Sequence, residues 1–200
     1  MTLVATPYGD AGVTLDRPDG VPLALLLLGH GAGGGIGAPD LLEVTAAAVA
    51  AGLAVVRVTQ PYRVAGKRGT PRPPVLDEAW LAVAARVRVD GLPLVVGGRS
   101  SGARVACRTA TALGAVAVVA LAFPTAPPRT PEQDRLAELA APTVPVLVVQ
   151  GERDPFGVPP PAPGRTVHLL AATHTLRGPA AREAGRAVAT WLTALLAGHP

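Results

Sequence analysis

The stretch GRSSG at residues 98–102 decides the expected fold of this chain. It holds the only two serines among the 200 residues, Ser100 and Ser101, and fits the pattern G-x-S-x-G. The apolar run Leu94–Val96 predicts a strand before it, and Ser101–Leu113 predicts a helix after it. A tight turn between strand and helix, with small residues two positions either side, exposes the central serine hydroxyl above a sheet. The pattern therefore predicts Ser100 as a nucleophile, and the alternative is a glycine-rich turn without chemistry.

Strand-like and helix-like segments alternate along the rest of the chain. Several strand-like segments are continuous valine and leucine runs, which are typical of parallel strands buried on both faces. The expected strands are Gly12–Asp16, Leu23–Leu28, Ala54–Thr59, Leu94–Val96, Val116–Ala122, Val146–Gln150 and Thr166–Leu170. The expected helices are Pro39–Ala51, Val75–Val89, Ser101–Leu113, Pro131–Ala140 and Pro179–Leu196. The alternation predicts an α/β fold: one domain over residues 1–200, with a mostly parallel sheet of about seven strands between helices.

The composition argues against several classes of partner. The formal charge is +4, and 17 of the 18 basic residues are arginines scattered along the chain, while aromatic residues make up only 3%. Nucleic-acid binding surfaces cluster basic residues and place aromatic ones among them, so we expect no nucleic-acid partner. The start of the chain shows no secretory signal, and Val21–Leu28 is too short to cross a bilayer. We therefore expect a cytoplasmic protein without membrane association.

Cysteine and histidine are too few and too dispersed for a metal site. The single cysteine, Cys107, cannot form an internal disulfide, and we expect it to fill the core. The four histidines show no H-x-x-x-H spacing. We expect neither a metal nor a cofactor.

A serine nucleophile needs an acid and a base, and in this motif they follow the serine in the order Asp, then His. The acid candidate is Asp154, which follows the strand Val146–Gln150 at its carboxyl end, where the active-site loops of parallel sheets gather. An aspartate before a proline also occurs for local reasons, as in an Asx-turn. Glu152 is the alternative acid.

The base candidate is His174, just beyond the last expected strand, in a loop that should project toward the same edge of the sheet. The other histidines are less well placed. His168 lies within a strand, His199 lies at the chain terminus, and His30 belongs to a glycine loop.

That glycine loop, GHGAGGG at residues 29–35, follows the strand Leu23–Leu28 directly. Glycines let backbone N–H groups approach developing negative charge, so we expect an oxyanion hole here. The expected donors are the N–H of Ser101 and that of Ala32, with Gly33 as the alternative to Ala32. The same loop also fits G-x-G-x-x-G, which is typical of dinucleotide sites. Such a site needs an acidic residue near the end of the next strand to bind the ribose, and this chain has none there. Only Arg57, within that strand, could meet a ligand, through a 2′-phosphate.

The motifs at residues 30–34, 98–102 and 151–154, together with His174, resemble those of α/β-hydrolases. The chain is most similar to small, capless, dienelactone-hydrolase-like proteins, especially the branch of testis-expressed and NSL-complex-subunit homologues. Members of that branch carry H-G-A-G, G-G-x-S-x-G-x-R and Q-G-x-x-D-P-F-G, which here read as residues 30–33, 97–104 and 150–157. The resemblance implies the α/β-hydrolase fold without a sizeable cap. Dienelactone hydrolases use a cysteine where this chain has Ser100, so their substrate does not carry over.

Together these features predict a serine hydrolase that cleaves a small carboxylic ester, thioester or lactone through Ser100, Asp154 and His174. The segment between Ala122 and Val146 has room for one short helix, which predicts an open site suited to small substrates. Arg99, next to the nucleophile, is expected to form a surface ion pair or to meet an anionic substrate. The alternative is a catalytically silent protein that presents the hydrolase fold to a partner.

Overall fold

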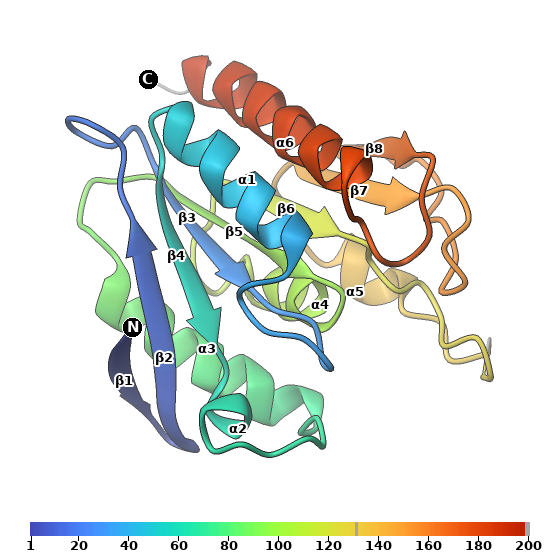
Figure 1. The fold of residues 1–200 in the computed structure, drawn as a ribbon, viewed down its shortest axis with the longest axis horizontal. Coiled ribbons are helices and arrows are strands. Elements are labelled where there is room, and N and C mark those ends of the chain that lie inside the picture. Colours follow the sequence, from blue (N-terminus) through green and yellow to red (C-terminus); the bar gives the residue numbers. More distant parts are fainter. Residues whose placement is uncertain (131, 199–200) are drawn as a thin grey trace.

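An eight-stranded sheet runs through this computed structural model, which describes residues 1–130 and 132–198 (Figure 1). The strands are β1 (Thr2–Thr6), β2 (Gly9–Asp16), β3 (Leu25–Gly29), β4 (Ala54–Thr59), β5 (Leu94–Arg99), β6 (Ala117–Leu121), β7 (Val146–Gly151) and β8 (Arg165–Leu170). Their order in the sheet is β1-β2-β4-β3-β5-β6-β7-β8. The pairs β1–β2 and β2–β4 are antiparallel and all the others are parallel. The mostly parallel sheet is therefore confirmed.

Helices cover both faces of the sheet. They are α1 (Pro39–Ala50), α2 (Pro61–Val64), α3 (Pro73–Val87), α4 (Ser101–Thr109), α5 (Leu136–Ala140) and α6 (Pro179–Ala197). The long helices α1 and α6 lie side by side over one face, and α3 and α4 lie on the other (Figure 1). No cap domain is present among the described residues, because α5 is the only helix between β6 and β7.

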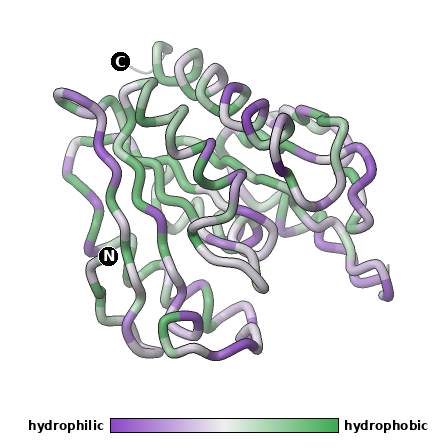
Figure 2. The backbone as a smooth tube through the Cα atoms, in the orientation of Figure 1, coloured by the Kyte–Doolittle hydropathy of each residue, from purple (hydrophilic) through white to green (hydrophobic). Residues whose placement is uncertain are grey.

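The core forms two layers because β3 is apolar on both sides. Leu25 and Leu27 pack into the layer that contains Trp80 of α3. Leu26 and Leu28 pack into the opposite layer, beneath α1 and α6. Successive side chains of a strand point to opposite faces, so a continuous leucine run fills both layers at once. Figure 2 shows the corresponding hydrophobic colour along the central strands.

Two elements were not expected from the sequence, and one expected helix is shorter than predicted. The edge strand β1 was missed, since a short, largely exposed strand lacks a strong apolar pattern. The four-residue helix α2 was also missed. The helix expected from Pro131 to Ala140 is present only over Leu136–Ala140, where the Asp134 carboxylate accepts a hydrogen bond from the Leu136 N–H at 2.7 Å. Residue 131, its expected start, lies outside the described residues.

The carboxyl ends of the parallel strands β3 to β8 meet at one edge of the sheet, as parallel pairing requires. The loops that carry the candidate site residues therefore converge there. Cys107 of α4 is buried, and desolvation raises the pKa of its thiol to about 12, so it packs rather than reacts. Within residues 1–130 and 132–198, no helix combines the length and apolarity needed to cross a bilayer.

Candidate active site

Ser100 occupies a strained turn between β5 and α4. Its φ is 52° and its ψ is −109°, a region that residues with a side chain rarely adopt. The Ser100 N–H donates to the Leu121 carbonyl at the end of β6 at 2.9 Å, which fixes the turn to the sheet. A Cβ on Gly98 would lie 2.6 Å from the Gly29 oxygen, and one on Gly102 would lie 2.5 Å from it. Both flanking glycines are therefore required for the strand and the helix to pass this closely.

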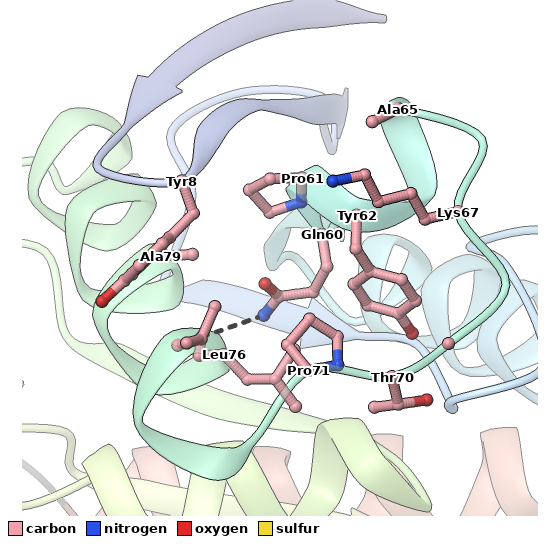
Figure 3. Close-up of a pocket in the computed structure, with 12 residues that line it drawn as sticks. Tyr8, Gln60, Pro61, Tyr62, Ala65, Lys67, Thr70, Pro71, Leu76 and Ala79 are labelled. Atoms are coloured by element: carbon pink, nitrogen blue, oxygen red, sulfur yellow. Dashed lines mark hydrogen bonds between the residues drawn. The ribbon is translucent and has the colours of Figure 1, made fainter.

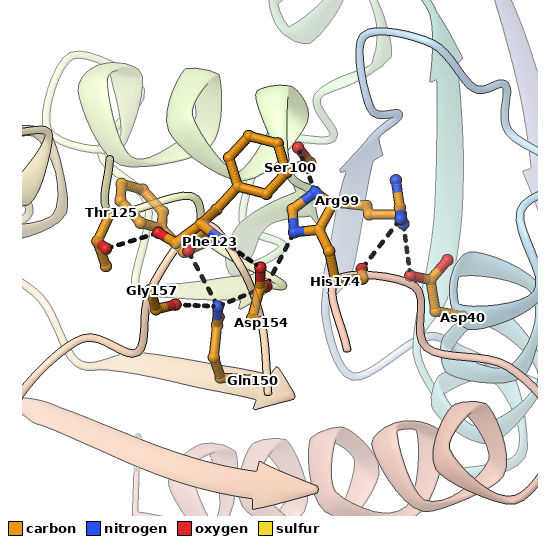
Figure 4. A network of polar contacts seen from close by, with 10 residues as sticks. Asp40, Arg99, Ser100, Phe123, Thr125, Gln150, Asp154, Gly157 and His174 are labelled. Carbon is orange, nitrogen blue, oxygen red and sulfur yellow. Dashed lines mark hydrogen bonds and ion pairs between the residues drawn. The ribbon is translucent and has the colours of Figure 1, made fainter. Parts of the chain in front are cut away.

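The structure brings the three expected side chains into one hydrogen-bonded chain (Figure 4). His174 Nδ1 lies 2.8 Å from Asp154 Oδ2, and His174 Nε2 lies 3.0 Å from Ser100 Oγ. The Asp154 side chain is fully buried, while 16% of the His174 side chain is exposed. A carboxylate only accepts, so Nδ1 carries the proton, and the bare Nε2 can accept the hydrogen bond of the serine hydroxyl. Glu152, the alternative acid, is exposed and makes no hydrogen bond to His174.

Gln150 holds the Asp154 carboxylate in place, and the sequence had not indicated this role. Its Nε2 donates to Asp154 Oδ2 at 2.8 Å, and it also lies 2.8 Å from the Gly157 carbonyl and 3.1 Å from that of Phe123. The Phe156 N–H donates to the other carboxylate oxygen, Oδ1, at 2.8 Å. Both oxygens of Asp154 thus have fixed donors besides the imidazole.

A buried ion pair anchors the loop that carries His174. Arg99 Nε donates to Asp40 Oδ2 at 2.8 Å, and Arg99 Nη2 donates to the backbone carbonyl of His174 at 3.1 Å (Figure 4). Asp40 is 1% exposed. The expected surface ion pair of Arg99 is therefore wrong, because its partner lies inside the molecule. Burial raises the pKa of Asp40, and the neighbouring Arg99 acts in the opposite direction.

The ring of Phe156 packs against the imidazole of His174. The two ring centroids are 4.4 Å apart and the planes are tilted by 42°. The Phe156 carbonyl in turn accepts a hydrogen bond from the Thr125 hydroxyl at 2.7 Å. The Asp154–Gly157 turn therefore supports the imidazole from the side as well as at Nδ1.

Side chains also hold the glycine loop after β3. The Gln60 N–H donates to His30 Nε2 at 3.1 Å, so Nδ1 carries the His30 proton and donates to the Gly31 carbonyl at 2.8 Å. Burial lowers the pKa of His30, which favours this neutral ring. In a trans peptide the C=O and N–H point in opposite directions, so the Ala32 N–H points away from the Gly31 carbonyl that His30 binds.

The N–H groups of Ala32, Gly33 and Ser101 are free to meet a ligand. Neither Ala32 nor Gly33 donates a backbone hydrogen bond among the described residues. Ser101 begins α4, and the first N–H groups of a helix have no acceptor within it. A cavity of about 450 Å³ adjoins Gly33 and is lined also by Arg99 and Thr175, but neither Ala32 nor Ser101 lines it.

The remaining candidates lie elsewhere. His168 Nε2 faces Glu183 across 3.6 Å, and His199 lies outside the described residues. Arg57, the only residue that favoured a dinucleotide, forms an ion pair with Asp16 at 3.0 Å and donates to the Ile36 carbonyl. In the part of the chain that the structure describes, no cluster of His, Cys, Asp or Glu could hold a metal ion.

Comparison with known proteins points to one family. A family model described as an alpha/beta hydrolase domain matches residues 22–173. No curated protein matches the sequence significantly.

Three solved structures illustrate the similarity of fold. One is an α/β serine hydrolase without a lid from Xanthomonas campestris, with 20% identity over 98% of this chain and 90% of that one and a TM-score of 0.72. A dienelactone hydrolase from Anabaena variabilis has 19% identity over 98% and 95%, and a TM-score of 0.72. Est1E from Butyrivibrio proteoclasticus, solved with ferulic acid, has 16% identity over 98% and 100%, and a TM-score of 0.77. The resemblance to the testis-expressed branch stays a prediction.

Proposed function

Because this chain belongs to the alpha/beta hydrolase family, we propose that it is a serine hydrolase acting on a small carboxylic ester, thioester or lactone. Family membership alone does not assign a reaction, because one fold hosts many functions. The observation that carries the proposal is the continuous chain from Asp154 through His174 to Ser100, with contacts of 2.8 and 3.0 Å.

In the proposed reaction, the Ser100 oxygen attacks the substrate carbonyl while His174 Nε2 takes the hydroxyl proton. Asp154 holds the imidazole in the required tautomer and stabilises the imidazolium that forms. The N–H groups of Ser101 and Ala32 bind the oxyanion of the tetrahedral intermediate. The imidazolium then donates its proton to the departing alcohol, thiol or ring oxygen, leaving an acyl group on Ser100. Water, activated by His174, releases the acid and restores the serine.

Small substrates are favoured by the surroundings of Ser100. The only helix between β6 and β7 in the described chain is the five-residue α5, which leaves no cap to enclose a long chain. The site is therefore open, which suits a small or exposed ester better than a long acyl chain.

A fluorophosphonate probe tests the nucleophile directly, because it reacts with an activated serine. Wild type should be labelled and Ser100→Ala should not. Ser101→Ala is the matched control, since it removes the only other serine, and it should still be labelled. Labelling that persists in Ser100→Ala would exclude Ser100 as the nucleophile.

A panel of nitrophenyl esters, thioesters and lactones then measures turnover, with Ser100→Ala as the blank. We expect faster hydrolysis of short acyl groups than of long ones. A stably folded protein that neither reacts with the probe nor hydrolyses any member of the panel would favour the silent scaffold instead.

A further inference from the structure

A second cavity, of about 440 Å³, lies at the carboxyl end of β4, between α2, the loop that follows it and the start of α3 (Figure 3). None of the residues proposed for catalysis lines it. It is large enough for a small organic molecule. The proposed function leaves this cavity without a role.

Flat apolar surfaces form much of its wall. The rings of Pro61, Pro71, Tyr8 and Tyr62 are among the groups that line it (Figure 3). The side chains of Leu76 and Ala79, on α3, close the inner side. Such a slot suits a planar apolar body better than a branched one.

Two polar groups lie in the inner wall. Gln60 is only 7% exposed, and its Nε2 donates to the Leu76 carbonyl at 3.2 Å. That bond fixes the orientation of the amide, so the unpartnered atom is the acceptor Oε1. The Tyr62 hydroxyl donates to the Ala32 carbonyl at 3.0 Å, and burial raises its pKa, so it stays protonated. A buried acceptor without a partner is costly, and a hydroxyl on a ligand would satisfy it after a small adjustment of the wall.

The segment that forms most of the cavity wall is positively charged, and of its basic residues Lys67 lines the cavity itself. The segment from Pro61 to Leu76 contains four basic residues and no acidic one. These are Arg63, Lys67, Arg68 and Arg72. Within the described residues none of the four takes part in an ion pair. Glu78 of α3 accepts a hydrogen bond from the Tyr8 hydroxyl and does not line the cavity.

Lys67, the only lysine of the chain, is the cation best placed to reach a ligand. Its N–H donates to the Tyr62 carbonyl at 2.8 Å, which holds its backbone against the end of α2. It lines the cavity, and in the view of Figure 3 its side chain points from the loop in the direction of Pro61. An anion in the cavity would therefore meet this ammonium at the rim.

We infer that this cavity binds a small aromatic carboxylate, with its ring against the proline and tyrosine faces and its carboxylate at Lys67. Binding there requires neither Ser100, Asp154 nor His174, although Tyr62 in the cavity wall also holds the Ala32 carbonyl of the glycine loop. A hydroxyl at the far end of the ligand would donate a hydrogen bond to Gln60 Oε1.

The fluorescent acid 6-hydroxy-2-naphthoate carries both groups and is the probe for a titration of the wild-type protein. Saturable binding is expected, and Lys67→Gln should weaken it about tenfold, as for the loss of one charge-assisted hydrogen bond. The matched control is Arg182→Gln, which removes one exposed positive charge on α6, away from the cavity, and should leave the affinity unchanged. The uncharged 6-hydroxy-2-naphthamide should bind wild type about as weakly as the acid binds Lys67→Gln.

A second variant separates the cavity from general attraction to a basic surface. Val75→Phe places a ring in the cavity without removing charge, because Val75 is a half-buried lining residue at the start of α3. It should abolish saturable binding while the thermal unfolding midpoint stays close to that of wild type. The inference is overturned by no saturable binding to wild type, by equal affinity of the acid and the amide, or by binding that survives Val75→Phe.

Discussion

On the β7–β8 side of Ser100, contacts reach the side chains of Asp154 and His174 themselves, whereas on the β3–β4 side they reach only backbone carbonyls of the glycine loop. Gln150 and Phe156 fix Asp154 and His174 directly. His30 and Tyr62 instead bind the carbonyls of Gly31 and Ala32, and so set the directions of the N–H groups beyond them. On the acid–base side, a single substitution can therefore remove one functional group at a time. On the oxyanion side, a substitution can weaken the contacts that orient the backbone N–H groups, but only proline removes such a group.

The largest effect is expected where a reacting side chain is itself changed. Asp154→Asn should lower kcat by about 10³- to 10⁴-fold, by analogy with other serine triads. The amide N–H group can face His174 Nδ1, which favours the tautomer with the proton on Nε2, where it cannot accept from Ser100. Steady-state kinetics on a nitrophenyl ester measures the loss, and circular dichroism confirms the fold. A kcat within tenfold of wild type would remove Asp154 from the proposed mechanism.

The ion pair behind His174 should matter most for stability. Arg99→Met leaves the buried carboxylate of Asp40 unpaired and should lower the free energy of unfolding by about 3–5 kcal/mol near neutral pH. Urea unfolding, followed by fluorescence, measures the change.

The pH dependence of that loss has a definite sign. Burial raises the folded-state pKa of Asp40 above its ordinary 3.8, so its ionisation costs stability as pH rises through that folded-state pKa. Arg99 offsets the cost in wild type. The deficit of Arg99→Met should therefore be small below pH 3.8 and grow as pH rises above it. The double variant with Asp40→Asn should lose this pH dependence, and a deficit independent of pH would rule out the buried charge as its cause.

A substitution at Gln150 tests whether Asp154 depends on the hydrogen bond that Gln150 donates to it. Gln150→Met keeps the volume but removes the two amide hydrogens that the Phe123 carbonyl, the Gly157 carbonyl and the Asp154 carboxylate share, so we expect a loss of roughly 2–4 kcal/mol of stability. Because Asp154 loses one donor as well, kcat should fall by about tenfold while KM changes little. Gln133→Met, at an exposed position, is the control and should change neither quantity. A structural role alone would lower stability without lowering kcat in the remaining folded protein.

The same contrast explains how far the sequence could predict the site. Ser100, Asp154 and His174 each follow a strand and carry side chains of known chemistry, so strand positions and residue types predicted them. The residues that hold these side chains in place could not be predicted in this way. In the sequence, Gln150 is a polar residue near the end of an apolar strand, and Asp40 is an ordinary acidic residue in the first turn of a helix. Their roles depend on which loops meet across the sheet, and this follows from strand order rather than from local pattern.

The fold was predictable for a related reason. Continuous apolar runs such as Leu25–Leu28 fill two core layers and leave a strong signal in the sequence. Edge and loop elements such as β1 and α2 bury little apolar surface, so their signal is weak. Within the candidate site, the side chains proposed to react were therefore easier to find than the side chains that orient the backbone.

The smallest effect is expected at Tyr62, on the oxyanion side. Tyr62→Phe removes the hydrogen bond to the Ala32 carbonyl, which lies in the peptide that carries the Gly33 N–H. The loss of one such bond, about 0.5–1.5 kcal/mol, corresponds to a fall in kcat of roughly twofold to tenfold. Tyr8→Phe, which removes the other tyrosine hydroxyl of the chain, is the control and should leave kcat unchanged. The proposed donor, the Ala32 N–H, belongs to the peptide before the one that Tyr62 holds. The fall in kcat should therefore lie at the lower end of this range. A fall well beyond tenfold would instead assign the oxyanion contact to Gly33.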